Sequence, residues 1–135
     1  MSLSGFITLN EKLGEGGMGS VWAAHHAGLG TKVAVKLISR ELTDRHPTLL
    51  PRFQREALVT TRIMSPHAVQ NLEYGCTKEG APYIVMELLE GESLEDRLKR
   101  QGRLTLDETE IIVSQIAQVL TEAHELGITH RDIKP

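Results

Sequence analysis

The sequence predicts an α+β fold in which a five-stranded antiparallel sheet with one helix is followed by two further helices. Three observations carry this prediction. The first forty residues alternate in polarity, residues 50–64 repeat at helical spacing, and two helix-capping sequences follow residue 91. We therefore divide the chain into 1–90, with the sheet and its helix, and 91–135, with the later helices.

The five strands are expected in two groups. The stretches FITLNEKLG, SVWAAHHAG and KVAVKLIS are separated by EGGMG and GLGT, which indicates three antiparallel strands joined by tight turns. Farther along, AVQNLEYGC and APYIVMELL flank TKEG and predict a second hairpin. The uninterrupted YIVMELL run is typical of a well-buried strand.

Three helices are expected between and after these strands. The first covers about 50 to 64, because Pro51 suits a first helical turn and Pro66 ends the periodic run. Ser93 in SLED caps a short helix to about Arg100, and TLDE opens a longer helix that ends at Gly127. That longer helix carries an apolar stripe at helical spacing, formed by Ile112, Ile116, Val119, Ala123 and Leu126.

Composition limits the class of protein. The 135 residues are enough for one domain or part of one, and 40% hydrophobic with 24% charged residues is typical of a globular chain. The net charge of −3 without a basic block argues against nucleic acid as a partner, and no run is long enough for a membrane segment. Cys76 is the only cysteine, and the histidines lack metal-ligand spacing, so we expect no metal site and a reducing, cytoplasmic location.

The motif GEGGMGSV, from Gly14 to Val21, fits the pattern G-x-G-x-x-G-x-V. It lies between two expected strands, whereas the dinucleotide-binding motif leads from a strand into a helix. Residues without side chains would let the backbone of such a flap close on a phosphate chain. An ordinary hairpin turn explains the same glycines equally well.

The strand KVAVKLIS and the following helix each contain one charged residue in an unusual position. Alternation places Val33 and Val35 on one face and Ala34 with Lys36 on the other. Glu56 falls within the mostly apolar side of the helix 50–64. An ion pair between Lys36 and Glu56 would account for both and would hold the ammonium near phosphate oxygens, although a solvated strand lysine is the simpler alternative.

Taken together, the motifs resemble those of protein kinases. GEGGMGSV, VAVK, Glu56, YIVMELLEG and HRDIKP occur in the order and approximate spacing of that family, over essentially the whole chain. GGMG with HRDIKP is most similar to bacterial serine/threonine kinases of the eukaryotic type. The resemblance implies a kinase N-lobe in 1–90 and part of a helical C-lobe in 91–135.

The resemblance also implies an ATP site and catalytic residues. Gly14, Gly16 and Gly19 would cover the phosphates, Met86 would be the gatekeeper, and Glu87 with Leu89 would offer hinge backbone groups to adenine. The full set of implied ATP contacts is Leu13, Gly14, Gly16, Gly17, Gly19, Val21, Ala34, Lys36, Met86, Glu87 and Leu89. Lys36, positioned by Glu56, would hold the α and β phosphates. Asp132 would accept the proton of a substrate hydroxyl, and Lys134 would steady the transferred phosphate.

The family pattern continues beyond HRDIKP with an asparagine and a D-F-G aspartate that hold Mg²⁺, and these are not among the 135 residues. We therefore expect a kinase fragment that is inactive alone, with Mg²⁺ and a protein substrate used by the full-length enzyme. The apolar face of helix 107–126 would then lack its usual cover and is expected to support self-association.

A second hypothesis is a non-catalytic, pseudokinase-like module that binds nucleotide or a partner. The presence of Lys36, Glu56 and Asp132 favours the kinase fragment, because a chain freed from catalysis has no need of these residues.

Overall fold

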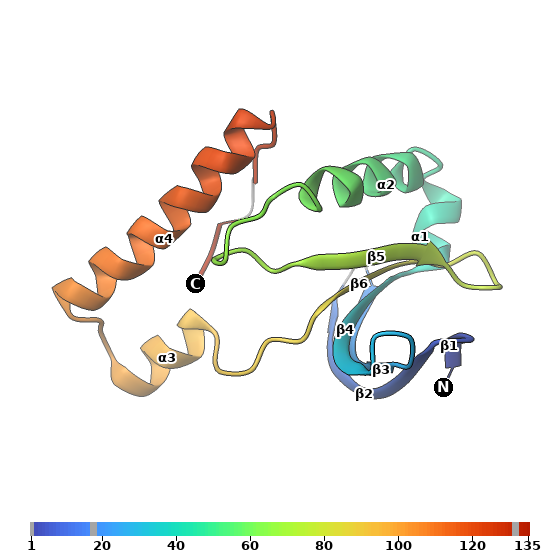
Figure 1. The fold of residues 1–135 in the computed structure, drawn as a ribbon, viewed down its shortest axis with the longest axis horizontal. Helices are drawn as coiled ribbons and strands as arrows, with labels where there is room; N and C mark the ends of the chain where they lie inside the picture. The colour runs from blue at the N-terminus through green and yellow to red at the C-terminus, as the bar shows by residue number, and fades with distance from the viewer. Residues whose placement is uncertain (1, 17–18, 131–132) are drawn as a thin grey trace. The chain divides into compact units, whose positions relative to one another are not determined.

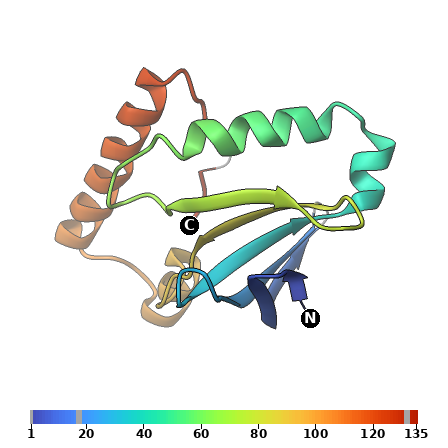
Figure 2. The same cartoon turned by 45° about the vertical axis from the view of Figure 1, so that its right-hand side comes forward.

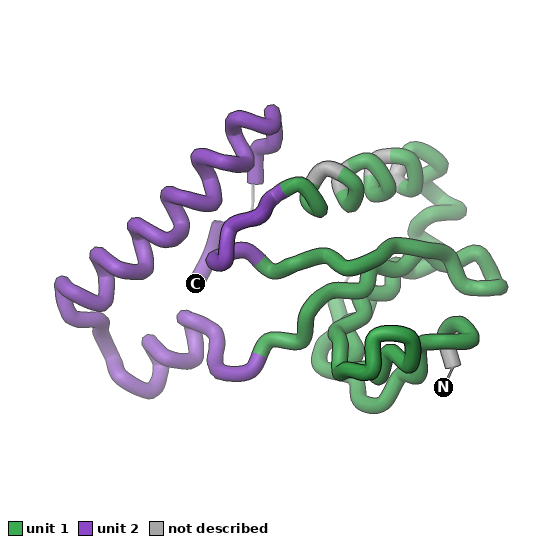
Figure 3. Tube along the Cα trace, in the orientation of Figure 1, with its two compact units in different colours: residues 1–62, 69–89 green, residues 63–68, 90–135 purple. Residues whose placement is uncertain are grey.

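The computed structural model describes the backbone of residues 2–16, 19–130 and 133–135, and their side chains apart from those at positions 2, 49, 52, 56 and 59. The chain forms two compact units, shown in Figure 3. Unit 1 comprises residues 1–62 and 69–89, and unit 2 comprises residues 63–68 and 90–135. The segment 63–68 therefore groups with the helical part of the chain, whereas the sequence-based division assigns it to the sheet.

Unit 1 is built on a six-stranded antiparallel sheet with the strand order β1-β2-β3-β4-β6-β5 (Figure 1). Its strands are β1 (Ser2–Ser4), β2 (Ile7–Gly16), β3 (Gly19–His26), β4 (Thr31–Ile38), β5 (Asn71–Cys76) and β6 (Pro82–Glu87). The β2-β3-β4 meander and the β5–β6 hairpin confirm the five expected strands. The sixth, β1, is a difference from the expectation, because three residues are too few to show an alternating pattern.

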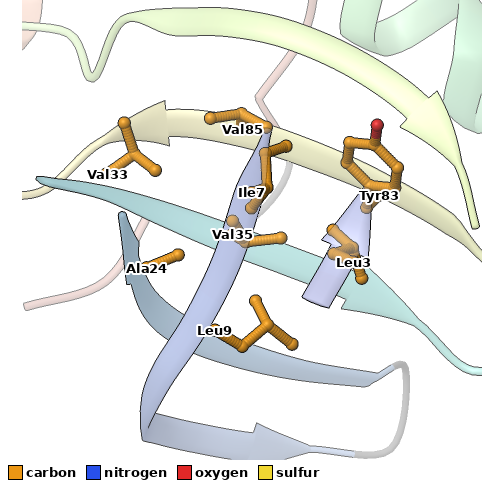
Figure 4. Packing of buried hydrophobic residues seen from close by; sticks show 8 residues of the cluster. All are labelled: Leu3, Ile7, Leu9, Ala24, Val33, Val35, Tyr83 and Val85. Atoms are coloured by element: carbon orange, nitrogen blue, oxygen red, sulfur yellow. The ribbon is translucent and has the colours of Figure 1, made fainter. Parts of the chain in front are cut away.

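One face of the sheet, which we call the core face, carries the hydrophobic core of unit 1. Cross-strand register pairs Val35 with Trp22 on one side and with Val85 on the other, so these side chains project to the same face. Figure 4 shows the cluster, to which five strands contribute. Its members are Leu3, Ile7, Leu9, Ala24, Val33, Val35, Tyr83 and Val85.

A small polar network lies at the edge of this core. The backbone amide of Leu29 donates to His26 Nδ1 at 3.1 Å, so the ring proton is on Nε2, which lies 3.2 Å from Glu73 Oε2. The Tyr83 hydroxyl donates to the other carboxylate oxygen of Glu73 at 3.4 Å. Burial, followed by the charge of Glu73, raises the pKa of Tyr83. The network joins β3, β5 and β6.

Strand β2 contains two register shifts that decide which side chains share a face. Leu9 pairs with Ala24 and Glu11 with Ala23, which leaves Asn10 as an extra residue. Lys12 pairs with Trp22 and Gly14 with Val21, which makes Leu13 a second extra residue. Each extra residue reverses the alternation of everything that follows it. As a result, Gly14 shares the face of Val21, opposite to the core face.

Two helices belong to unit 1. Helix α2 (Leu49–Thr60) lies along β5 in both Figure 1 and Figure 2. It ends four residues before the expected position 64, where the hydroxyls of Thr60 and Thr61 bond to the carbonyl oxygens of Ala57 and Leu58. Such local bonds compete with helix continuation. The short helix α1 (Arg40–Arg45) was not expected, since it has no side-chain cap and no buried residue among those described.

Unit 2 contains α3 (Leu94–Gln101) and α4 (Leu106–Glu125), and both expected caps are confirmed. Ser93 Oγ accepts from the Asp96 amide at 3.1 Å. Thr105 Oγ1 accepts from the Glu108 amide at 3.1 Å, while Glu108 Oε2 accepts from the Thr105 amide at 2.9 Å. This reciprocal pair is a capping box. Glu108 also receives bonds from Arg97 and Gln101 on α3.

The expected apolar stripe of α4 is only partly exposed. Ala123 is buried, Ile112 and Val119 are half-buried, and Ile116 and Leu126 are exposed by 37% and 38%. The most exposed apolar residues of the helix lie off this stripe, namely Leu106, Ile111 and Val113. No helix within the described ranges is long and apolar enough to span a membrane.

Candidate functional site

The second face of the sheet, opposite the core face, gathers four of the predicted nucleotide contacts. Register pairs Val21 with Lys36 and Ala34 with Met86, and paired residues project to the same side. Alternation along β4 places Ala34 and Lys36 on this side as well. Ala34 is buried, Val21 and Met86 are half-buried, and Lys36 is exposed. These four residues therefore combine a small apolar floor with the exposed side chain of Lys36.

The ends of β2 and β3 form a glycine-rich flap, and its glycines serve two different purposes. Gly19 is needed by the backbone, because its φ is 151° and an added Cβ would lie 1.9 Å from the Leu37 carbonyl oxygen. Gly14 and Gly16 are different, since a Cβ added at either would meet no atom within 4 Å. Neither has a positive φ. The fold itself does not require glycine at these two positions, and the surroundings of both are open.

The environment of Lys36 is described only in part. Lys36 is paired with Ile84 on β6 as well as with Val21 on β3. Its expected partner Glu56 lies on α2, but the Glu56 side chain is outside the described residues, so the ion pair stays a prediction. Gly17 also lies outside the described residues.

The expected catalytic residues of the C-terminal segment are not tested by the structure. Asp132 is outside the described residues. Lys134 belongs to unit 2 and is exposed, whereas Lys36 belongs to unit 1. The roles of Asp132 and Lys134 therefore remain predictions.

The end of β6 is held by a contact that sequence reasoning missed. The Glu87 amide donates to the Gln70 carbonyl oxygen at 3.0 Å, and Glu87 Oε1 accepts from the Gln70 amide at 2.8 Å. A carboxylate that accepts an amide proton makes a strong hydrogen bond. It orients the chain at Glu87, two residues before the exposed Leu89. No local pattern around Gln70 indicates this pairing across 17 positions.

Ligands for a metal ion are not grouped in the part of the chain that the structure describes. No set of three His, Cys, Asp or Glu side chains among these residues could hold a cation. We therefore assign the described residues no step that uses a metal.

Glycine-rich strand ends in an antiparallel sheet that carries an exposed strand lysine are the arrangement found in protein kinases. Residues 7–135 match the protein kinase domain, and the chain belongs to this family.

Curated relatives of the chain are bacterial kinases. It is 40% identical over 134 residues to the serine/threonine-protein kinase PknH of Mycobacterium bovis, covering 99% of this chain and 22% of PknH. It is 39% identical over 139 residues to PknA of Mycobacterium tuberculosis, covering 100% of this chain and 32% of PknA. Against the kinase pkn3 of Myxococcus xanthus it is 37% identical over 123 residues, with 91% and 22% covered. The chain thus spans about a fifth to a third of the length of these relatives.

Solved structures give the same result for the fold. The kinase domain of M. tuberculosis PknI superposes with a TM-score of 0.86 at 28% identity, covering 100% of this chain and 53% of that domain. A second structure of that domain gives a TM-score of 0.84 at 29% identity, with 100% and 56% covered. The two units therefore correspond to about half of a solved kinase domain.

Proposed function

We propose that unit 1 binds ATP on the second face of its sheet, and that a chain containing these residues phosphorylates serine or threonine in proteins. The observation that carries the proposal is the unfilled space at Gly14 and Gly16, beside the face that bears Lys36. The relatives named serine/threonine-protein kinases support the same reaction.

In this proposal each residue acts on a different part of the nucleotide. Val21, Ala34 and Met86 contact adenine, while backbone groups at Glu87 and Leu89 hydrogen-bond its edge. Leu13 packs beside the base, and amides of Gly14, Gly16, Gly17 and Gly19 approach the phosphates. The ammonium of Lys36, positioned by Glu56, binds the α and β phosphates and holds the triphosphate in one orientation.

The proposed transfer step uses the C-terminal segment. Asp132 accepts the proton of the substrate hydroxyl, whose oxygen forms the new bond to the γ phosphorus. The bond from that phosphorus to the bridging oxygen breaks, and ADP leaves. Lys134 stabilises charge on the transferred group. The 135 residues alone are expected to be inactive, because the family's Mg²⁺ ligands are not among them.

The first experiment is calorimetric titration of the chain with ATP, with and without magnesium, using Lys36→Ala and Lys32→Ala. Lys32 is the matched control, because it is an exposed lysine four residues away on the same face of β4. We expect Lys36→Ala to weaken ATP binding roughly tenfold or more, as loss of a charged hydrogen bond does. Absence of binding by the unchanged chain, or equal effects of the two substitutions, would contradict the proposal.

A second experiment tests the space beside the flap. Gly14→Val should weaken ATP binding while leaving the urea unfolding midpoint close to that of the unchanged chain, because no atom lies near the added side chain. Gly5→Val is its control, since Gly5 has equally open surroundings and an ordinary φ but lies outside the flap. If Gly14→Val destabilises the fold as well, the space is not reserved for a ligand.

The non-catalytic module is distinguished by phosphate transfer. A longer chain that includes the missing kinase segments should transfer labelled phosphate from ATP to protein, and Asp132→Asn should abolish the transfer but keep ATP binding. Binding without transfer in the unchanged longer chain would favour the module instead.

Self-association through helix 107–126 also remains a proposal. Its support is the exposure of Ile116 and Leu126 on the apolar stripe. Sedimentation of the chain and of a variant with Ile116→Ser and Leu126→Ser tests it. A monomer at all concentrations would rule out association through this face.

A further inference from the structure

Four side chains form a polar and aromatic cluster on the core face of the flap. Lys12 Nζ lies 2.5 Å from Glu15 Oε2 and 5.7 Å from the centre of the Trp22 ring. Trp22 Nε1 donates to Ser20 Oγ at 2.8 Å. Lys12 and Glu15 come from β2, and Ser20 and Trp22 come from β3. The cluster therefore joins the two strands of the flap through their side chains.

The extra residue in β2 makes this cluster possible. In a regular strand, residues three apart project to opposite faces. Because Leu13 is unpaired, Lys12 is opposite Trp22 and Glu15 is opposite Ser20, and both pairs face the same side. Gly14 and Gly16 are thereby turned to the second face. The single extra residue therefore places the charged side chains on the core face and the glycines on the second face.

Trp22 connects the cluster to the rest of unit 1. Its ring is partly buried and packs against the hydrophobic core. The cation of Lys12 is held over this ring, and cation–π contacts of that length are attractive. The flap lacks side chains of its own at Gly14, Gly16 and Gly19, so the cluster supplies fixed contacts close to its tip, where Gly16 pairs with Gly19.

We propose that Lys12, Glu15 and Trp22 are positioning residues that hold the flap over the phosphates from the side opposite the nucleotide. The inference rests on the proposed ATP site, which it deepens. Lys12 ties β2 to the anchored Trp22, and Glu15 orients the ammonium of Lys12. None of these side chains lies on the second face, so they hold the flap without competing with the ligand.

The test measures hydrogen exchange of the flap amides, at residues 14–16 and 20–22, in the absence of nucleotide. Lys12→Met keeps most of the length of the side chain but removes its charge, Lys12→Arg keeps the charge, and Lys32→Met is the control on β4. We expect exchange about two- to fivefold faster in Lys12→Met, the size of effect that exposed ion pairs and cation–π contacts give. Lys12→Arg should restore slow exchange, and Lys32→Met should leave it unchanged. Equal exchange in Lys12→Met and the unchanged chain would overturn the proposal.

A nucleotide titration separates positioning from general stability. Lys12→Met should weaken ATP binding several-fold and leave adenosine binding unchanged, because adenosine has no phosphates for the flap to cover. A variant that also carries Glu15→Gln should remain weak. If that double variant recovers both ATP binding and slow exchange, Lys12 acts only by neutralising Glu15, and the positioning role is wrong. Failure of the unchanged chain to bind ATP contradicts the proposed function, whereas the exchange experiment decides the cluster independently.

Discussion

The sheet of unit 1 and the helices of unit 2 are stabilised in different ways. In the sheet, eight buried side chains from five strands form one cluster, and Val33, Val35 and Val85 are fully inaccessible. In α3 and α4, both described along their whole length, Ala123 is the one buried residue. Capping bonds and ion pairs such as Arg100 with Glu92 hold those helices instead. Residues distant in sequence stabilise the first region. In the second region the caps and ion pairs join near neighbours, and the Met64 amide adds a distant bond to Glu122 Oε1 on α4.

This difference shows which interactions contribute most to the stability of each region. Capping and surface ion pairs contribute modestly, and most helix stability in proteins comes from packing of an apolar face. The sheet has such packing within its own unit. The exposed Leu106, Ile111 and Val113 of α4 add nothing comparable. We expect substitutions in the sheet core to lower the free energy of unfolding much more than substitutions at exposed positions of α4.

The largest expected effect is in the sheet core. Ile7→Ala removes a side chain that is 1% exposed and should lower the free energy of unfolding by about 3 kcal/mol. Ile111→Ala, at a site that is 56% exposed, should change it by less than about 0.5 kcal/mol. Urea unfolding followed by the fluorescence of Trp22, the only tryptophan, reports on the sheet. Similar losses of unfolding free energy in the two variants would contradict the proposed difference between the two regions.

A smaller loss of stability is expected at Gly75, where the backbone of β5 lies against the core residue Tyr83. A Cβ at Gly75 would lie 2.6 Å from the Tyr83 hydroxyl oxygen, so Gly75→Ala must displace a ring that is bonded to Glu73. We expect a loss of about 1–3 kcal/mol. Gly16→Ala is the matched control, since nothing lies near its added methyl group. Equal stability of the two variants would show that the ring moves freely.

The smallest expected effect is a pH-dependent loss of helix at the start of α4. The bond from the Thr105 amide, followed by that from Gln101, lowers the pKa of Glu108. A lowered pKa means that the ionised carboxylate is favoured in the folded state, so its contribution is present above the ordinary Glu pKa of about 4.3 and disappears as pH falls through the lowered value. Far-UV ellipticity should therefore decrease over that acidic range. Glu108→Gln should show a smaller change, and an identical profile would assign the effect to other carboxylates.

Local signals explain which helices could be predicted. Ser93 and Thr105 each bond to a backbone amide three residues later, so their capping sequences were sufficient to place α3 and α4. The short helix α1 has no such signal, and the end of α2 depends on hydroxyl bonds of Thr60 and Thr61 that compete with helix geometry.

For the candidate site, too, only the features that depend on a local pattern could be predicted from the sequence. Alternation correctly separated Val35 from Lys36, because it needs only the two-residue period of a strand. The face of Gly14 depends on the extra residue Leu13, and the hold on Glu87 depends on Gln70. Both arise from pairing between distant segments, which no local pattern of residues encodes.

The unpaired Leu13 has a consequence for how the chain tolerates changes in length. Deleting this one residue leaves every motif letter from Gly14 to Val21 intact, yet it would exchange the two surfaces of the flap from Gly14 to Gly16. Glu15 would then be directed toward the proposed phosphate position, and a negative charge would oppose another negative charge. Loop insertions elsewhere cost little. In this strand, the proposed binding of ATP depends on whether the number of residues is odd or even.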